Sequence, residues 1–131
     1  MRIERGSTWN IWDFHVHTPY SRLNNNFGFT PASGNDEYFD KYVETLFTKA
    51  VDKGVVAIGI TDYFSIDGYK RIKQEYLSNL QKMKALFPDD DLRERIMRLF
   101  IFPNIEFRLN IFVGKKSCPI NYHVFFSDKV V

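Results

Sequence analysis

The sequence predicts a mixed α/β fold built from about four strands and two main helices. Three features carry this prediction. A strand-length segment at residues 11–17 ends in two histidines, an amphipathic helical repeat fills residues 36–53, and a continuous apolar run follows at residues 55–60. A strand, a helix and a second strand within about 50 residues form a βαβ unit, in which the strands are parallel and the crossover is right-handed.

The composition fits one modest folded domain covering residues 1–131. Hydrophobic residues make up 44% and aromatic residues 17%, which favours a packed core over a disordered segment. The net charge of +2 gives no strong attraction to nucleic acid or anionic membranes. The single cysteine, Cys118, excludes an intrachain disulfide, and no segment resembles a membrane span or a signal peptide. We therefore expect a cytoplasmic protein without membrane contact.

The first strand covers residues 11–17. Alternation divides it into an apolar and a polar face: Trp12, Phe14 and Val16 against Asp13, His15 and His17. Two imidazoles at i and i+2 can reach one cation, and Pro19 ends the strand just beyond them. The simpler alternative is that a strand histidine is only a hydrogen-bonded residue.

A loop rich in Pro, Ser, Asn and Gly should follow at residues 18–35, and then the helix at residues 36–53. Asn35 or Asp36 can cap this helix, and Gly54 can end it. Its apolar residues recur at helical spacing, which indicates a core-facing stripe instead of a cofactor site.

The second strand, residues 55–60, ends at Thr61-Asp62-Tyr63, so we expect Asp62 on the same rim as His15 and His17. A second helix should run from Asp67 to about Phe87. A short helix at residues 92–97 should precede the third strand.

That third strand begins at residues 99–102, is interrupted at Pro103 and resumes at residues 105–107. It carries Glu106, a carboxylate that is costly to bury without a cation or a basic partner. Residues 114–117 form a turn but no phosphate-binding loop, because Leu109 stands where that loop needs glycine. A fourth strand, residues 121–126, contains His123.

Two strand pairings stay open at this point. If residues 105–113 and 119–127 form a hairpin, Glu106 falls opposite His123, and if the strands are parallel both residues still reach the rim. In either case all three histidines occupy polar positions near strand ends, together with Glu106 and Asp62. The sequence therefore predicts a metal site.

These residues resemble the PHP family, the polymerase and histidinol phosphatase domain. The matching segments are Asp13-Phe14-His15-Val16-His17-Thr18 with Ser21, Thr61-Asp62-Tyr63, Glu106 and His123. Longer segments of the chain resemble even more closely the PHP-like region that opens large bacterial ATPases of the TrlF type, which are implicated in phage defence. These segments are Arg5-Gly6-Ser7 and residues 61–69, 103–108 and 123–127.

The resemblance implies a distorted (β/α)7 barrel that binds one to three divalent ions (Mn, Fe or Zn) and hydrolyses a phosphoester, with nucleic acid as one candidate substrate. The implied metal ligands are His15, His17, Glu106 and His123, with Glu106 bridging. Asp13 and Asp62 are the implied catalytic residues, and both would act beside the ligands by orienting them.

The chain also departs from the family pattern. Tyr63 stands where a histidine ligand is expected, Arg22-Leu23 replaces a further ligand, and the family's last Asp-x-His motif is missing before Val131. Four strands cannot close such a barrel. We therefore expect an N-terminal portion of the domain, whose partners would be a C-terminal half, a downstream ATPase domain or a second copy of the chain.

Two alternatives come from other classes of protein. An eroded PHP-like module, inactivated at Tyr63, would serve as a scaffold or a nucleic-acid sensor. An amidohydrolase-type barrel also begins with His-x-His, but Thr61-Asp62 and Glu106 at the ends of strands favour the phosphoesterase.

Overall fold

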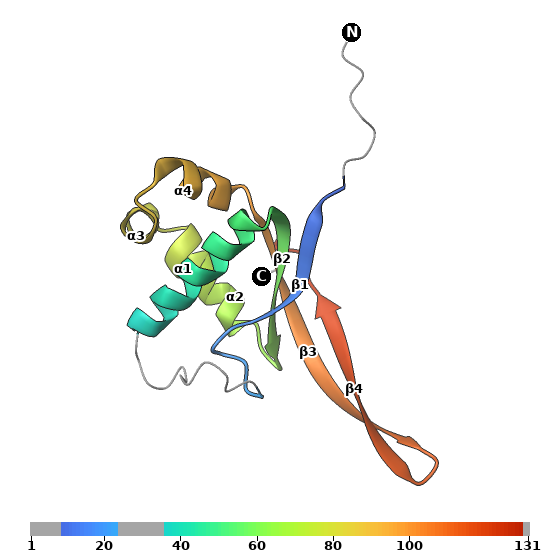
Figure 1. The fold of residues 1–131 in the computed structure, drawn as a ribbon. Helices are drawn as coiled ribbons and strands as arrows, with labels where there is room; N and C mark the ends of the chain where they lie inside the picture. The colour runs from blue at the N-terminus through green and yellow to red at the C-terminus, as the bar shows by residue number, and fades with distance from the viewer. Residues whose placement is uncertain (1–8, 24–35, 130–131) are drawn as a thin grey trace.

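The structure, a computed structural model, describes residues 9–23 and 36–129. It has a mixed α/β fold, in which one four-stranded sheet in the order β1-β2-β3-β4 carries its helices on one face (Figure 1). The strands are β1 (Ile11–His17), β2 (Val55–Tyr63), β3 (Phe100–Val113) and β4 (Lys116–Phe125). The helices are α1 (Asp36–Asp52), α2 (Asp67–Arg71), the π-helical segment η2 (Ile72–Leu77), α3 (Leu80–Leu86) and α4 (Asp90–Met97).

This confirms the predicted class, mixed α/β with four strands. The candidate cap Asn35, most of the loop at residues 18–35 and the motif residues Arg5-Gly6-Ser7 lie outside the described residues. No described helix is long and apolar enough to cross a membrane.

Strand pairing decides the alternative that the sequence left open. β1, β2 and β3 are parallel, as the strand–helix–strand pattern predicts, whereas β3 and β4 are antiparallel. The hairpin turns at Gly114-Lys115, where Gly114 adopts a φ of 64° that suits glycine at the first central position of a two-residue turn. The resulting register places Glu106 directly opposite His123.

The predicted long helix from Asp67 to Phe87 is interrupted. The chain widens into the π-helical segment, and then the Ser78 amide and hydroxyl both donate to the Lys73 carbonyl and end it. Asn79 starts α3 as an N-cap, because its side-chain oxygen accepts the Lys82 amide at 3.1 Å. Two polar residues with a strong preference for helix ends thus override the apolar periodicity.

The predicted interruption at Pro103 does not occur, because β3 is continuous through this residue. Pro103 pairs with Ile60 of β2 at the level where the ladder to β4 ends. Its carbonyl still accepts the Phe126 amide at 3.0 Å. Proline has no N–H to donate, but its absence therefore removes no pairing partner between β3 and β4.

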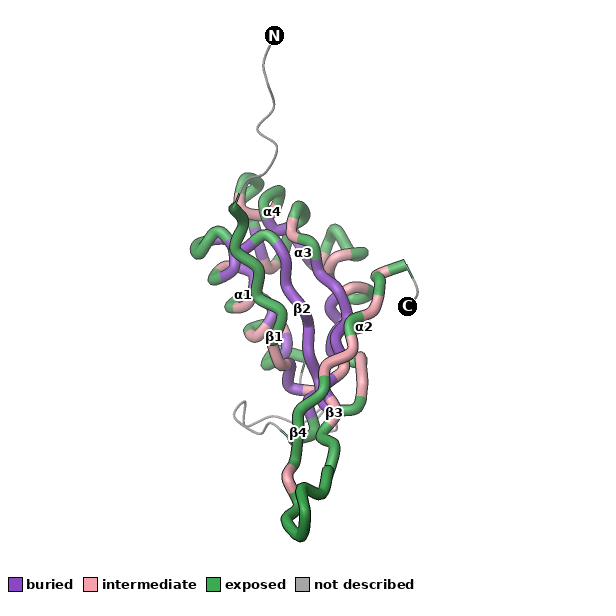
Figure 2. The backbone as a smooth tube through the Cα atoms, turned by 90° about the vertical axis from the view of Figure 1, so that its right-hand side faces the viewer, coloured by how far each residue is buried: buried purple, intermediate pink, exposed green. Residues whose placement is uncertain are grey.

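The core lies between the helices and the sheet. The predicted stripe of α1 faces it, and Phe39, Val43 and Phe47 are fully buried. Figure 2 shows β2 buried along most of its length, while the far end of the β3–β4 hairpin is exposed. The core therefore positions the first part of β3, and the hairpin extends beyond it.

A β-bulge in β1 changes the predicted faces of that strand. Asp13 pairs with Ile58 and Val16 with Ile60, so three steps along β1 match two along β2. The extra residue reverses the alternation. Asp13 and Val16 both line a hollow on the helix side. Trp12, Phe14, His15 and His17 lie on the open face, so the predicted grouping of Trp12 and Phe14 with Val16 is wrong.

Gly59 makes room for this bulge. A Cβ at this position would lie 2.5 Å from the Phe14 carbonyl oxygen. The bulge turns that carbonyl toward the open face, where it accepts hydrogen bonds from Thr61 Oγ1 at 3.1 Å and Asn104 Nδ2 at 3.0 Å. The bulge is thus supported by specific partners and brings both histidines onto one face.

The sheet is strongly curled into half of a barrel. β1 and β4 are its two edges, and in a flat sheet they would be about 14 Å apart. The ring centroids of His15 on β1 and His123 on β4 are nevertheless 4.6 Å apart. The curl therefore brings side chains from both edges together over the open face.

Candidate metal centre

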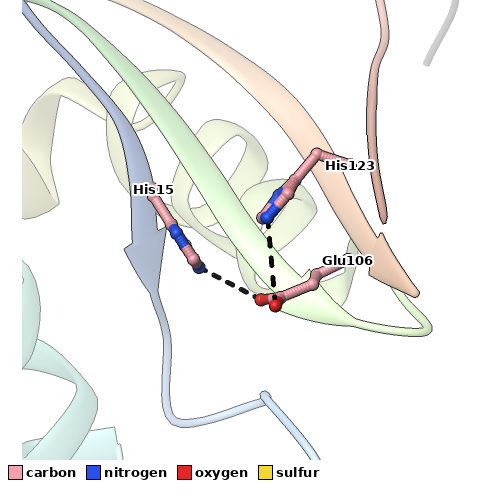
Figure 3. Close-up of side chains that lie close together, drawn as sticks. All are labelled: His15, Glu106 and His123. Atoms are coloured by element: carbon pink, nitrogen blue, oxygen red, sulfur yellow. Dashed lines mark hydrogen bonds and ion pairs between the residues drawn. The ribbon is translucent and has the colours of Figure 1, made fainter. Parts of the chain in front are cut away.

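Glu106 is the centre of the site. Its side chain is 0% exposed, and it projects from β3 onto the open face of the sheet. Glu106 Oε2 lies 3.1 Å from His15 Nε2 and 3.3 Å from His17 Nε2. Glu106 Oε1 lies 3.9 Å from His123 Nε2. Figure 3 shows His15 and His123 pointing toward this carboxylate from β1 and β4. The other three predicted metal ligands therefore meet around the Glu106 carboxylate.

The nitrogen atoms are close enough to share an ion. His15 Nε2 and His17 Nε2 are 3.0 Å apart. One ligand atom from each of His15, Glu106 and His123 lies within 4.8 Å of the other two. Three imidazole nitrogens and a carboxylate form a donor set suited to Zn, Fe or Mn.

The buried carboxylate lacks a compensating charge. Glu106 Oε1 has no hydrogen-bond partner, and among the described residues neither lysine nor arginine lies within ion-pair distance of Glu106. Burial lowers the pKa of His17, with a further lowering from His15. His17 is therefore neutral near pH 7, which is the form that binds a metal. An unpartnered buried oxygen facing three imidazoles fits a divalent ion.

The outer ring nitrogens of His17 and His123 also have partners. His17 Nδ1 lies 3.0 Å from Ser21 Oγ, which in turn accepts the Tyr63 amide at 3.2 Å. His123 Nδ1 lies 3.2 Å from Asn104 Nδ2. Such contacts fix the orientation of each ring, as they do around metal-binding histidines. Sequence reasoning gave Ser21 and Asn104 no role, although both stand inside the quoted motifs.

Asp62 lies near the end of β2, on the expected rim, but its side chain faces away from the histidines. Alternation along β2 turns Thr61 and Tyr63 toward the site and Asp62 toward the helices. Its carboxylate is 1% exposed and accepts the Thr18 amide at 2.9 Å and the Thr18 hydroxyl at 2.8 Å. It also accepts the Gly68 amide at the start of α2, so Asp62 joins the segment after β1 to that helix. Burial raises its pKa to about 6.

Asp13 also lies outside the cluster. It faces the helix-side hollow, which Lys49 and Lys53 also line. Its carboxylate accepts the backbone amide of His15 at 3.3 Å and makes no described contact with an imidazole ring. Asp13 therefore supports the bulged backbone, and the orientation of the rings depends on other residues.

Tyr63 occupies the position where the resemblance implies a histidine. Its ring stacks on His17, with centroids 5.2 Å apart and planes at 17°. A phenol offers a poor ligand when protonated, so Tyr63 acts here as a wall of the site. An apolar hollow of about 450 Å³ adjoins the site on the same face, lined by Trp12, Phe14, Ala57, Phe100, Phe102, Phe125 and Phe126.

No protein-family model matches the chain, and neither a curated protein nor a solved structure does. The fold and the cluster on its open face define a curled α/β sheet that gathers three histidines around one buried glutamate.

Proposed function

We propose that this chain is the N-terminal portion of a PHP-type, metal-dependent phosphoesterase domain. The observation that carries the proposal is the buried Glu106 carboxylate, which faces three imidazoles and keeps one oxygen without a partner. In this proposal His15, His17, Glu106 and His123 hold one to three divalent ions of Mn, Fe or Zn. The curled sheet, with its two edge strands, is consistent with part of a (β/α)7 barrel.

The reaction is hydrolysis of a phosphoester, with nucleic acid as one candidate substrate. When bound, a divalent ion would activate water and offset negative charge on the phosphoryl oxygens. The chain itself supplies three imidazole donors, of which His17 has a lowered pKa, a buried carboxylate and an apolar hollow on the same face of the sheet. Ser21 and Asn104 hold two of the rings in place, so the donors are already oriented.

We place this domain in the cytoplasm and propose that it works with a C-terminal half or a downstream ATPase domain. Its edge strands could also pair with a second copy of the chain. Within the described residues no strand pairs with the outer edge of β1 or β4, and this supports a need for further strands, because an exposed sheet edge tends to pair.

A second candidate function rests on Tyr63. Its ring covers His17 at the position of an expected ligand, which favours a module that has lost catalysis and retains binding. Such a scaffold or nucleic-acid sensor would hold fewer ions and would show no turnover.

Metal content tests the proposal. The chain is loaded with Mn²⁺ or Zn²⁺, desalted and measured by elemental mass spectrometry. Two variants, His15→Ala/His17→Ala and Glu106→Gln, are measured beside it. Glu94→Gln, a charge change on the exposed side of α4, is the matched control for Glu106→Gln. We expect at least one ion per wild-type chain, kept in the control and lost in the other two variants. A wild-type chain without metal would contradict the proposal.

Turnover separates the two candidate functions. Hydrolysis of a chromogenic phosphodiester by the metal-loaded chain, abolished in the double histidine variant, would support the phosphoesterase. Metal binding without turnover in a chain supplied with its remaining strands would favour the binding module.

A further inference from the structure

Arg108 lies beside the metal centre on the same face of the sheet. It follows Glu106 by two residues along β3, and alternation therefore points both side chains to the open face. Across the ladder, Glu106 pairs with His123 and Arg108 pairs with Asn121. The site face of the hairpin thus carries a guanidinium next to the histidine cluster.

The hydrogen bonds of Arg108 go to neutral oxygens. Its Nη2 donates to Tyr63 Oη at 3.3 Å, and its Nε donates to Asn121 Oδ1 at 3.3 Å. Its guanidinium carbon lies 5.6 Å from the centroid of the Tyr63 ring. Because that ring stacks on His17, one aromatic side chain separates the guanidinium from a metal ligand.

Arg108 also lacks an acidic partner. Among the described residues no carboxylate lies within ion-pair distance of it, whereas Arg71, Arg93 and Arg98 each pair with at least one. Guanidinium has five N–H donors, and the two neutral contacts leave three of them for another acceptor. The side chain is exposed, so a ligand can reach those donors.

We infer that Arg108 forms an anion site next to the metal centre and binds a phosphoryl oxygen of the substrate. The inference rests on the proposed function, because it assigns the second contact of the same phosphoryl group. A planar fork with free donors matches two phosphoryl oxygens, and an arginine held by Tyr63 and Asn121 loses less side-chain freedom on binding. Tyr63 is then a positioning residue. It stands where a metal ligand is expected, and it holds the guanidinium in place instead.

Phosphate binding tests this assignment. Inorganic phosphate is titrated by calorimetry into the Mn²⁺-loaded wild-type chain, Arg108→Gln, Arg108→Lys and the control Arg98→Gln, and metal content is measured in every sample. Arg98 is 73% exposed and pairs with Glu94 on the helix side, so its loss changes the net charge equally without touching the site.

We expect Arg108→Gln to keep its metal and to bind phosphate at least about tenfold more weakly, because a charge-assisted contact is lost. Arg108→Lys should fall between Arg108→Gln and the wild type, since it keeps the charge and loses the fork. Arg98→Gln should match the wild type.

The outcomes separate this inference from the proposed function. Full metal content with equal phosphate affinity in Arg108→Gln would overturn the anion site and leave the metal centre intact. Metal-loaded wild-type chain that binds no phosphate would overturn it in the same way. A wild-type chain without metal would overturn the proposed function and this inference with it.

Discussion

The sheet has two buried carboxylates, Glu106 and Asp62. Changing each to its amide should have opposite effects on metal binding and on stability. Glu106 faces the imidazoles and has an unpartnered oxygen, whereas Asp62 is fully engaged with Thr18 and Gly68 on the helix side. We expect Glu106→Gln to remove metal binding and to leave the metal-free fold nearly as stable. Asp62→Asn should keep metal binding and destabilise the chain.

The size of the effect follows from binding linkage. At an ion concentration of 100 times Kd, binding adds about 2.7 kcal/mol to the free energy of unfolding. For a chain of this size 1 kcal/mol corresponds to about 4 °C in Tm, so the wild-type Tm should rise by about 11 °C. If Glu106→Gln weakens affinity about 100-fold, the same ion concentration adds only about 0.4 kcal/mol, or less than about 2 °C.

For Asp62→Asn the ion-induced rise should stay near about 11 °C, while both Tm values fall. The amide leaves a buried donor at Thr18 or Gly68 without an acceptor, which costs about 1–3 kcal/mol. Differential scanning calorimetry with and without Mn²⁺ measures both quantities on one instrument, with Glu94→Gln as the control. A full metal-induced shift in Glu106→Gln, or its loss in Asp62→Asn, would refute the assignment of the two carboxylates.

Three further predictions concern the backbone and the buried acid. Gly59→Ala should cost about 3 kcal/mol, measured by urea unfolding, because its Cβ meets the Phe14 carbonyl at 2.5 Å; an unchanged midpoint would mean that the bulge yields easily. Phe64 has a φ of 63°, so Phe64→Gly should change stability by less than about 1 kcal/mol, whereas Phe64→Val should cost about 1–2 kcal/mol; the reverse order would contradict a left-handed residue at this position. Because burial raises the pKa of Asp62 to about 6, its protonation stabilises the folded chain below about pH 4 and this stability is lost as the pH rises through 6. Relative to Asp62→Asn, the wild type should therefore gain about 2 kcal/mol between pH 7 and pH 4, and parallel stability curves for the two proteins would disprove the shift.

The pairing of Glu106 with His123 was within reach of sequence reasoning. A two-residue turn at Gly114-Lys115 fixes the register of its hairpin, and that register sets these two residues opposite each other. The parallel strands followed in the same way from the strand–helix–strand pattern. Local geometry of this kind depends on residues close in sequence.

The faces of Asp13 and Asp62 were beyond simple alternation. The bulge in β1 depends on Gly59 in a neighbouring strand, and on Asn104 in a third, to support the Phe14 carbonyl. Partners so distant in sequence leave no signal within residues 11–17. The place of Asp62 could have been inferred, because if Tyr63 stands at a ligand position the preceding residue must face the other way.

The curl of the sheet has a mechanical consequence. β1 and β4 share no hydrogen-bond ladder, yet His15 and His123 approach each other across the open face. An ion held between them and Glu106 would link the two edge strands through side chains and so connect the sheet into a closed ring. Opening the sheet would then require breaking that link, so a bound ion would add rigidity to the curved surface beyond what its ladders and core provide.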